Sequence, residues 1–425
     1  MLNPRFCCVT IYAIFVTDLQ EGACMNGKKI TSVLKLILLS VLLGVIGGVL
    51  GTLFSKGVSL VTNLRGAQPW LLYLLPLAGV LSVALYRWLN VTDMGTNHVL
   101  RATNEENVLS PNLTPAIFFA SLLSHCCGAS VGREGAALQL GGSSAVLVSK
   151  WFKLSQKEGK LLIYCGMAGV FSSVFGTPFA AAAFALEVVF VGHICWQAAI
   201  PVLITSFTSY GIAHLLGAHA ERFVLTDTPA ITLAVTGKVL LLGLLMVGLS
   251  YLFCLSLEYS EKLMKTLFKN PYLRIAVGGT AIIGLTLLVG SYDYNGAGVA
   301  VIERIFSHNE FVPYAFALKI LFTCIAVGSG FKGGEIVPTL FIGATFGALA
   351  GTLLGLPAAF AAALGMTALF CGVTNCPLAS ILLAAELFSG KGMGMISLSV
   401  IITYCLSGKI SLYSAQKTSG LKKLF

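Results

Sequence analysis

The sequence GSGFKGGEIVP, at residues 328–338, places the acid Glu335 between two glycines and a strongly apolar segment. A shorter stretch of the same kind, GREG at residues 132–135, carries Glu134. Two further acids, Glu187 and Glu386, end the apolar segments that begin at Pro178 and Pro377. A carboxylate at the centre of a membrane helix costs about 2.5–3.5 kcal/mol on insertion scales. These four acids therefore indicate where the function of the chain should be sought.

The composition is that of a polytopic membrane protein. Only 10% of the 425 residues are charged and 56% are hydrophobic, and the mean hydropathy is +0.88, whereas about 25% of the residues of a soluble domain are charged. About 20 helical residues span a bilayer. Apolar runs of suitable length occupy residues 33–54, 70–88, 159–191, 239–257 and 274–290. Alternating ten-residue strands are absent, so we expect an all-α fold rather than a barrel.

The positive charge is concentrated between the apolar segments and at the chain ends. The formal net charge is +10, with clusters at 28–29, 150–160, 262–269 and 422–423. This pattern is typical of cytoplasmic loops that follow the positive-inside rule, and both termini are expected on the cytoplasmic side. No recognition motif accompanies the basic residues, so no nucleic-acid partner is expected.

The sequence gives little support for enzymatic or metal chemistry. The twelve cysteines form no C-x-x-C spacing and the six histidines form no ligand spacing, so neither a metal nor a cofactor is expected. A G-x-x-x-x-G-K-[ST] motif is also absent, which argues against ATP-driven transport. A membrane-embedded hydrolase using Ser124, His125 and Glu134 is a remote alternative, because adjacent side chains rarely face one another on a helix. A scaffold or receptor that transports nothing is a further alternative.

The chain reads as a duplication of roughly 200 residues. Glu187 and Glu386 lie 199 residues apart, and Glu134 and Glu335 lie 201 apart. We expect a first membrane repeat at residues 25–220 and a second at 221–425. Residues 1–24 form a poorly defined extension, and Met25 before Lys28 is a more natural start.

Several expected helices are too short or too interrupted to cross the membrane. They lie at residues 94–104, 112–127, 134–149, 335–349 and 377–388. Duplicated halves with interrupted segments are typical of transporters with a binding site at the repeat interface. A helix N-terminus offers free N–H donors and about half a positive charge, so the segments beginning at Gly95, Gly132 and Gly333 predict a converging anion site. Helix packing by glycine is the alternative reading.

The motifs GREG at 132–135, GSGFKGGEIVP at 328–338 and LYS at 412–414 resemble those of the CLC family of chloride channels and anion/proton antiporters. The resemblance extends from about residue 30 to residue 420. It implies a homodimer in which each subunit has two inverted-topology repeats with broken helices and its own anion pathway. The absence of a long segment after residue 420 suits a prokaryotic member, in the inner or plasma membrane.

Details resemble the fluoride-type branch of this family. Met94 replaces the serine of the chloride-type motif, Asn97 follows it, and Glu335 comes after a double glycine. Val188 stands where chloride/proton exchangers carry an inner glutamate. Val337 is a departure, because fluoride-type relatives commonly carry threonine there. Thr339 is rotated by about 200° on a helix and is a poor substitute.

The resemblance also implies roles for particular residues. Glu134 would be the gating acid that exchanges with the anion and carries a proton, and a structural ion pair with Arg133 is the weaker alternative because neighbouring helical side chains point apart. Glu335 would be a second proton relay or a helix cap. Tyr413 would line the inner side of the anion site. The expected anion-binding set is Met94, Gly95, Asn97, Gly132, Arg133, Gly135, Gly333, Gly334, Ile336, Val337 and Tyr413.

The sequence thus predicts a fluoride/proton antiporter that exports fluoride, with fluoride or another small halide, the proton, a second copy of the chain and the bilayer as partners. A chloride or other halide exchanger, or a passive anion channel on the same fold, is the alternative. For Glu187 and Glu386, acids that fix packing are expected rather than transport residues.

Overall fold

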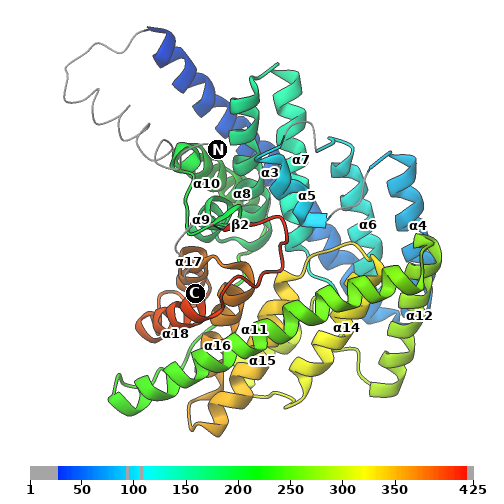
Figure 1. The fold of residues 1–425 in the computed structure, drawn as a ribbon, viewed down its shortest axis with the longest axis vertical. Helices are drawn as coiled ribbons and strands as arrows, with labels where there is room; N and C mark the ends of the chain where they lie inside the picture. Colours follow the sequence, from blue (N-terminus) through cyan, green and yellow to red (C-terminus); the bar gives the residue numbers. More distant parts are fainter. Residues whose placement is uncertain (1–26, 92–94, 106–108, 419–425) are drawn as a thin grey trace.

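The computed structural model describes residues 27–91, 95–105 and 109–418, and these described residues are almost entirely helical. The expectations for residues 1–24, for Met25, for Met94 and for the last residues of the chain lie outside this part. Figure 1 shows the helices of the first half above those of the second half, with the long helix α11 crossing the second half diagonally.

The two halves repeat the same order of helices, from a long helix through short and broken ones. The first half contains α3 (Gly27–Ala67), η3 (Pro69–Leu74), α4 (Leu75–Trp88), α5 (Gly95–Ala102), α6 (Leu113–Cys127), α7 (Glu134–Trp151), α8 (Gln156–Phe175), α9 (Pro178–Glu187) and α10 (Trp196–Leu215). The second half contains α11 (Leu233–Leu267), α12 (Pro271–Val289), α13 (Val299–His308), α14 (Ala315–Ser329), α15 (Ile336–Leu353), α16 (Ala358–Thr374), α17 (Pro377–Leu387) and α18 (Met393–Leu406). This is the expected all-α architecture of two repeats with broken helices.

Small residues bring corresponding helices together in each half. A Cβ added at Gly141 of α7 would lie 2.0 Å from the carbonyl oxygen of Gly166 on α8. A Cβ at Gly343 of α15 would lie 2.5 Å from the carbonyl oxygen of Gly365 on α16. Backbones can approach this closely only where no side chain intervenes, which is how membrane helices commonly pack. The same device therefore fixes α7 on α8 and α15 on α16.

The short helices α9 and α17 cap each other. Glu187, the last residue of α9, accepts hydrogen bonds from the backbone N–H groups of Leu378 (3.2 Å) and Ala379 (2.8 Å) at the start of α17. Glu386, near the end of α17, accepts from Phe179 (3.0 Å) and Ala180 (2.8 Å) at the start of α9. Both acids thus satisfy helix N-termini, which are favourable places for a negative charge. Their role in packing agrees with the expectation.

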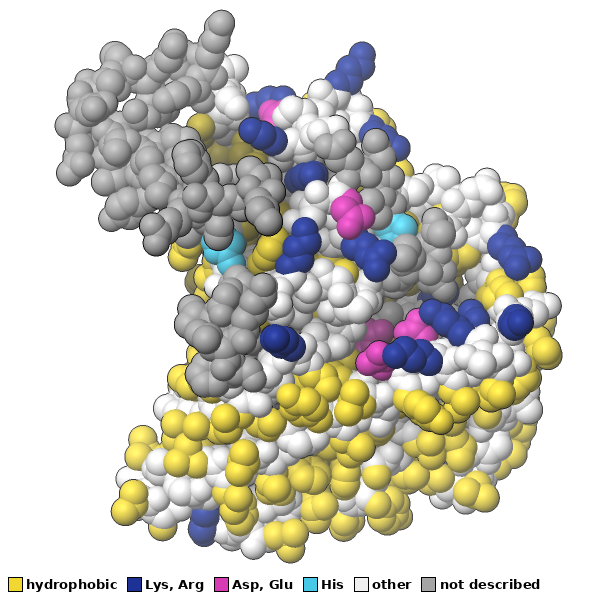
Figure 2. Space-filling view, viewed as in Figure 1, with side chains coloured by type: hydrophobic (Ala, Val, Ile, Leu, Met, Phe, Trp, Pro, Cys, Tyr) yellow, Lys and Arg dark blue, Asp and Glu magenta, His cyan; other side chains and the backbone are white. Residues whose placement is uncertain are grey.

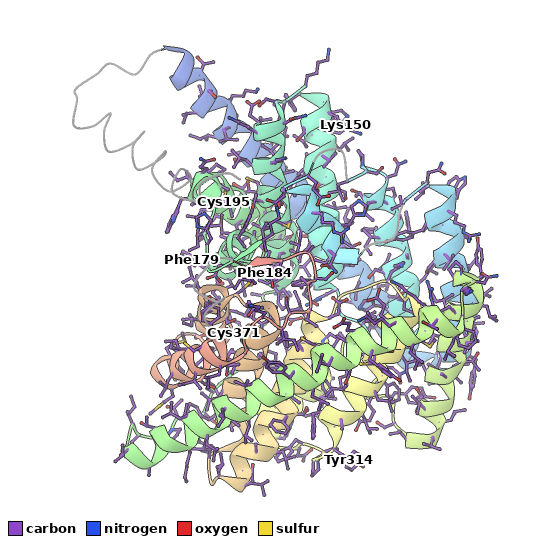
Figure 3. All side chains as sticks on the ribbon, viewed as in Figure 1. Lys150, Phe179, Phe184, Cys195, Tyr314 and Cys371 are labelled. Atoms are coloured by element: carbon purple, nitrogen blue, oxygen red, sulfur yellow. The ribbon has the colours of Figure 1, made fainter. Side chains whose placement is uncertain are left out.

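An aromatic cluster anchors α9 in the interior. The ring of Phe184 lies 5.3 Å from that of Phe171 on α8 and 5.6 Å from that of Phe370 on α16, measured between centroids. Figure 3 shows Phe184 near the middle of the molecule, with Cys371 of α16 below it. The cluster therefore joins the first half to the second.

Two contacts along α3 show which segments lie at its opposite ends. Lys35, early in α3, pairs with Glu158 at the start of α8 (2.9 Å). Lys56, later in α3, donates to the carbonyl oxygen of Leu216 after α10 (2.6 Å). The basic segment 150–160 and the segment after α10 therefore lie at opposite ends of α3.

Six helices among the described residues are long and apolar enough to cross a membrane by length and composition. They include α3, α10, α11, α12 and α15. Figure 2 shows hydrophobic side chains over the lower part of one face, with charged side chains gathered in the middle and upper parts. These observations agree with a protein embedded in a bilayer.

Candidate functional site

Helices α7 and α15 begin against each other. The backbone N–H of Gly132 donates to the carbonyl oxygen of Gly334 (2.6 Å), and the N–H of Gly334 donates to that of Gly132 (2.7 Å), forming an isolated antiparallel bridge. A shift of 201 residues carries Gly132 onto Gly333 and Arg133 onto Gly334. The bridge therefore lies where the two repeats meet, and it brings together the residues that precede both helices.

The glycines at this junction are required by close approach. A Cβ at Gly334 would lie 2.2 Å from the backbone nitrogen of Gly135, and one at Gly333 would lie 2.5 Å from Cβ of Val131. A Cβ at Gly135 would lie 2.7 Å from Cα of Gly334. The expected glycines thus lie together, and because they have no side chain the two helix starts can touch.

Helix α5 joins the same junction. It begins at Gly95, which has a φ of +56°, a conformation that glycine adopts without strain. A Cβ at Gly135 would lie 3.2 Å from the hydroxyl oxygen of Thr96, a residue outside the expected anion-binding set. Asn97 accepts a hydrogen bond from the backbone N–H of Ala415 (3.0 Å), which ties α5 to the segment carrying Tyr413.

Glu134 occupies the first turn of α7 and is completely buried. No donor among the described residues hydrogen-bonds either carboxyl oxygen. Its charged contact is Arg133, whose Nε lies 3.4 Å from Oε1 of Glu134. The expectation that these two side chains point apart is wrong here. Arg133 is the residue before the helix, and its long side chain folds back toward its neighbour.

Arg133 has two further partners outside α7. One guanidinium nitrogen donates to Oγ of Ser55 on α3 (3.1 Å), and another pairs closely with Oε1 of Glu221. Glu221 lies in the segment between α10 and α11. No signal in the sequence indicates Glu221, because it belongs to no motif and lies 88 residues from Arg133.

Glu335 is the residue before α15, and its side chain makes no capping hydrogen bond. Its Oε2 is buried and has no hydrogen-bond partner among the described residues. The geometry thus gives no support to the helix-cap alternative. The two acids of the repeat-related motifs share a pattern: each carries a buried carboxyl oxygen at the start of a broken helix.

Tyr413 reaches the site from the C-terminal segment. It is 2% exposed, and its hydroxyl oxygen has no hydrogen-bond partner among the described residues. It lies within electrostatic range of both Glu335 and Glu134. A parallel pairing of β1 (Phe190–Val191) with β2 (Lys417–Thr418) fixes the segment nearby.

The start of α15 offers apolar side chains to the site. Ile336 and Val337 are buried. The hydroxyl of Thr339 donates to the carbonyl oxygen of Glu335 (2.8 Å). The hydroxyl hydrogen of Thr339 is therefore committed within the helix.

The residues of the hydrolase alternative bind backbone groups. Oγ of Ser124 donates to the carbonyl oxygen of Ala120 (3.0 Å) and accepts from the N–H of Lys332 (3.2 Å). Nδ1 of His125 contacts the carbonyl oxygen of Ser121 (2.9 Å). The arrangement lacks the nucleophile–base contact that such chemistry needs. Within residues 27–418, apart from the undescribed gaps, no group of three or more metal-ligating side chains occurs.

Comparison with known proteins supports the resemblance. The family model described as "Voltage gated chloride channel" matches residues 78–408. A "Chloride/fluoride channel protein" of Pseudomonas syringae pv. tomato is 30% identical over 378 residues, which cover 87% of this chain and 83% of that protein.

Solved structures of similar proteins have the same fold. One described as a CLC-type fluoride/proton antiporter superimposes with a TM-score of 0.88 and 32% identity, over 93% of this chain and 100% of the other. A slow cyanobacterial Cl-/H+ antiporter superimposes with a TM-score of 0.75 and 21% identity, over 88% of this chain and 94% of the other. The protein described here therefore belongs to the voltage-gated chloride channel (CLC) family of membrane proteins.

Proposed function

We propose that this protein is a fluoride/proton antiporter that exports fluoride. The observation that carries the proposal is the pair of acids, Glu134 and Glu335, at the facing starts of two broken helices. Each has a buried carboxyl oxygen without a hydrogen-bond partner among the described residues. Burial without a satisfied hydrogen-bond network is costly for an ionised carboxyl group, so these two acids are the candidates for proton exchange, with Arg133 as the charged contact of Glu134.

In the proposed mechanism, backbone N–H groups at the starts of α5, α7 and α15 bind the anion through partial charges. Ionised Glu134 is itself an anion and competes for this position. Protonated Glu134 leaves it, so the halide and the proton-bearing side chain alternate. In this mechanism the hydroxyl of Tyr413 lines the site, and Glu335 relays protons on the inner side, where Val188 offers no acid.

Several features favour fluoride over chloride. Asn97 and Glu335 resemble the fluoride-type branch, as does Met94, which lies outside the described residues. A relative with 32% identity is described as a fluoride/proton antiporter. Val337, which removes a hydroxyl at the start of α15, favours the second candidate, a chloride or other halide exchanger.

The proposal includes a homodimer in the inner membrane of a prokaryote. Exposed apolar side chains on α9, α10, α17 and α18 give one surface for a second copy: Phe179, Trp196, Ile200, Phe207, Leu378 and Ile401. The rings of Phe179 and Phe207 lie 4.8 Å apart between centroids, which joins α9 to α10 in this surface.

The test is transport by the purified protein in liposomes loaded with potassium fluoride. A fluoride electrode records efflux while a trapped pH-sensitive dye records proton entry. Fluoride efflux that drives proton entry against a pH gradient is the expected result. Efflux without proton movement would contradict antiport, and suppression of fluoride flux by equimolar chloride would favour the second candidate.

A further inference from the structure

The guanidinium of Arg133 is shared between two carboxylates. One nitrogen pairs closely with Glu221, and Nε lies 3.4 Å from Oε1 of Glu134. A third nitrogen binds Oγ of Ser55. The two carboxylates therefore compete for the same guanidinium.

Backbone contacts fix the position of Glu221. Its N–H donates to the carbonyl oxygen of Phe175 at the end of α8 (3.3 Å). The preceding residue, Ala220, packs on Gly176, where an added Cβ would lie 2.5 Å from Cα of Ala220. The side chain of Glu221 is 23% exposed, whereas that of Glu134 is fully buried. Glu221 is therefore a fixed, partly solvated acid that pairs with Arg133 beside the buried Glu134.

We propose that Glu221 is a positioning residue that holds Arg133 back from a full ion pair with Glu134, so that the carboxylate of Glu134 can take up a proton during transport. This inference rests on the proposed function and adds a residue to it. An opposite charge within about 4–6 Å favours the ionised form of a carboxyl group. A tight Arg133–Glu134 pair would therefore keep Glu134 ionised and bound.

Other titratable groups lie around Arg133 and Glu134, among them Glu335, which is near Tyr413, and Arg65 and Lys319, which are near His125. His125 on α6 is within electrostatic range of Arg133. Tyr413 is within range of Glu134 from the C-terminal segment, and Lys56 on α3 binds the carbonyl oxygen of Leu216. In the salt bridges formed by the described residues, Glu221 and Glu134 are the carboxylates that pair with Arg133. Loss of the charge at Glu221 thus leaves Glu134 as the remaining acid in contact with Arg133.

The test is Glu221→Gln in the liposome assay, with fluoride efflux measured against external pH. We expect half-maximal efflux at a pH lower by about one unit, because stronger pairing must be overcome by acid. Efflux at neutral pH falls by about tenfold and recovers at low pH, and the fluoride-to-proton ratio stays as in the wild type. Glu221→Asp, which keeps the charge, restores much of the wild-type profile. Glu303→Gln, at an exposed acid of α13, is the matched control.

A pH profile of Glu221→Gln that superimposes on that of the wild type would overturn the inference, whether or not the rate is reduced. A structural role alone lowers the amount of folded protein without moving the profile. Infrared difference spectra of the purified protein, with Glu134→Gln used to assign the carboxyl band, keep the two proposals separate. If the wild type does not couple fluoride to protons, the proposed function fails. The inference about Glu221 then stands if the Glu134 band titrates at a lower pH in Glu221→Gln than in the wild type, and it fails if the band titrates at the same pH.

Discussion

At the residue scale, glycines without side chains allow the helix starts that form the site to meet. Gly132 and Gly333 were predicted from the sequence to begin helices that bind the anion, and the family resemblance added Gly135 and Gly334 to the expected set. The structure adds that these glycines let two helix starts touch, with an added Cβ at Gly334 only 2.2 Å from the nitrogen of Gly135. The sequence could not show which glycine faces which, because the partners lie about 200 residues apart.

Gly334→Ala should separate the starts of α7 and α15. Inserting a methyl group into a packed junction typically costs about 1–3 kcal/mol, and displacing a reacting group by about 1 Å can cost roughly 100-fold in rate. We expect fluoride efflux to fall by roughly 100-fold, with a lower melting temperature in detergent. Gly248→Ala on α11, where nothing lies within 4 Å of the added Cβ, is the control. Wild-type efflux by Gly334→Ala would show that the junction can relax.

Glu335→Gln should slow turnover, because an amide cannot pass on a proton from the inner side. We expect roughly 100-fold slower fluoride efflux, the lower end of the range for losing a proton-transfer group. The rate is measured in the liposome assay beside Glu303→Gln. A rate equal to that of the wild type would return Glu335 to the role of a residue that merely begins a helix.

Long-range charge contacts were the part of the site that sequence reasoning could not reach. Arg133 was selected, but an ion pair with Glu134 was the less favoured alternative. The argument from helical spacing failed because Arg133 precedes the helix. Glu221 carries no local signal at all. Its ion pair with Arg133 forms only in the folded chain, where the segment after α10 lies beside α3 and the start of α7.

At the element scale, the reciprocal capping of α9 and α17 explains two of the four membrane acids. The sequence predicted that Glu187 and Glu386 fix packing, and the duplication was visible in their 199-residue spacing. That each acid caps the helix carrying the other requires the two helices to lie antiparallel, which no local pattern reveals.

Glu187→Ala should destabilise the fold while leaving the transport chemistry intact. Loss of a capping acceptor costs about 0.5–2 kcal/mol, and here one carboxylate serves two N–H donors of α17. We expect the free energy of unfolding to fall by about 1–2 kcal/mol, seen as a lower melting temperature in detergent. Glu303→Ala is the control. A changed fluoride-to-proton ratio in Glu187→Ala would instead place this acid in the transport pathway.

At the scale of the whole molecule, the composition and spacing of motifs predicted the fold class well, because a bilayer allows few architectures. The repeated helix order from α3 to α10 and from α11 to α18 agrees with the expected duplication. The expected boundary between residues 220 and 221 falls in the segment between α10 and α11.

The sidedness of the molecule gives a prediction of its own. Lys35 pairs with Glu158, so the basic segment 150–160 lies at the early end of α3, and the segment after α10 lies at the other end. Cysteine introduced at exposed Lys157 should react with an impermeant thiol reagent from the cytoplasmic side alone. Cysteine at exposed Thr226 should react from the outside alone. Labelling of both from one side, above the wild-type baseline, would contradict their placement on opposite sides of the membrane.

The central claim is that Glu134 carries the proton that fluoride exchanges for. The most direct measurement is simultaneous recording of fluoride efflux and proton uptake in liposomes containing Glu134→Gln, with Glu303→Gln as the matched control. We predict that Glu134→Gln passes fluoride without any proton movement, because a neutral amide can neither bind nor release a proton, while the control keeps the wild-type ratio. Proton uptake by Glu134→Gln at the wild-type ratio to fluoride would contradict the account.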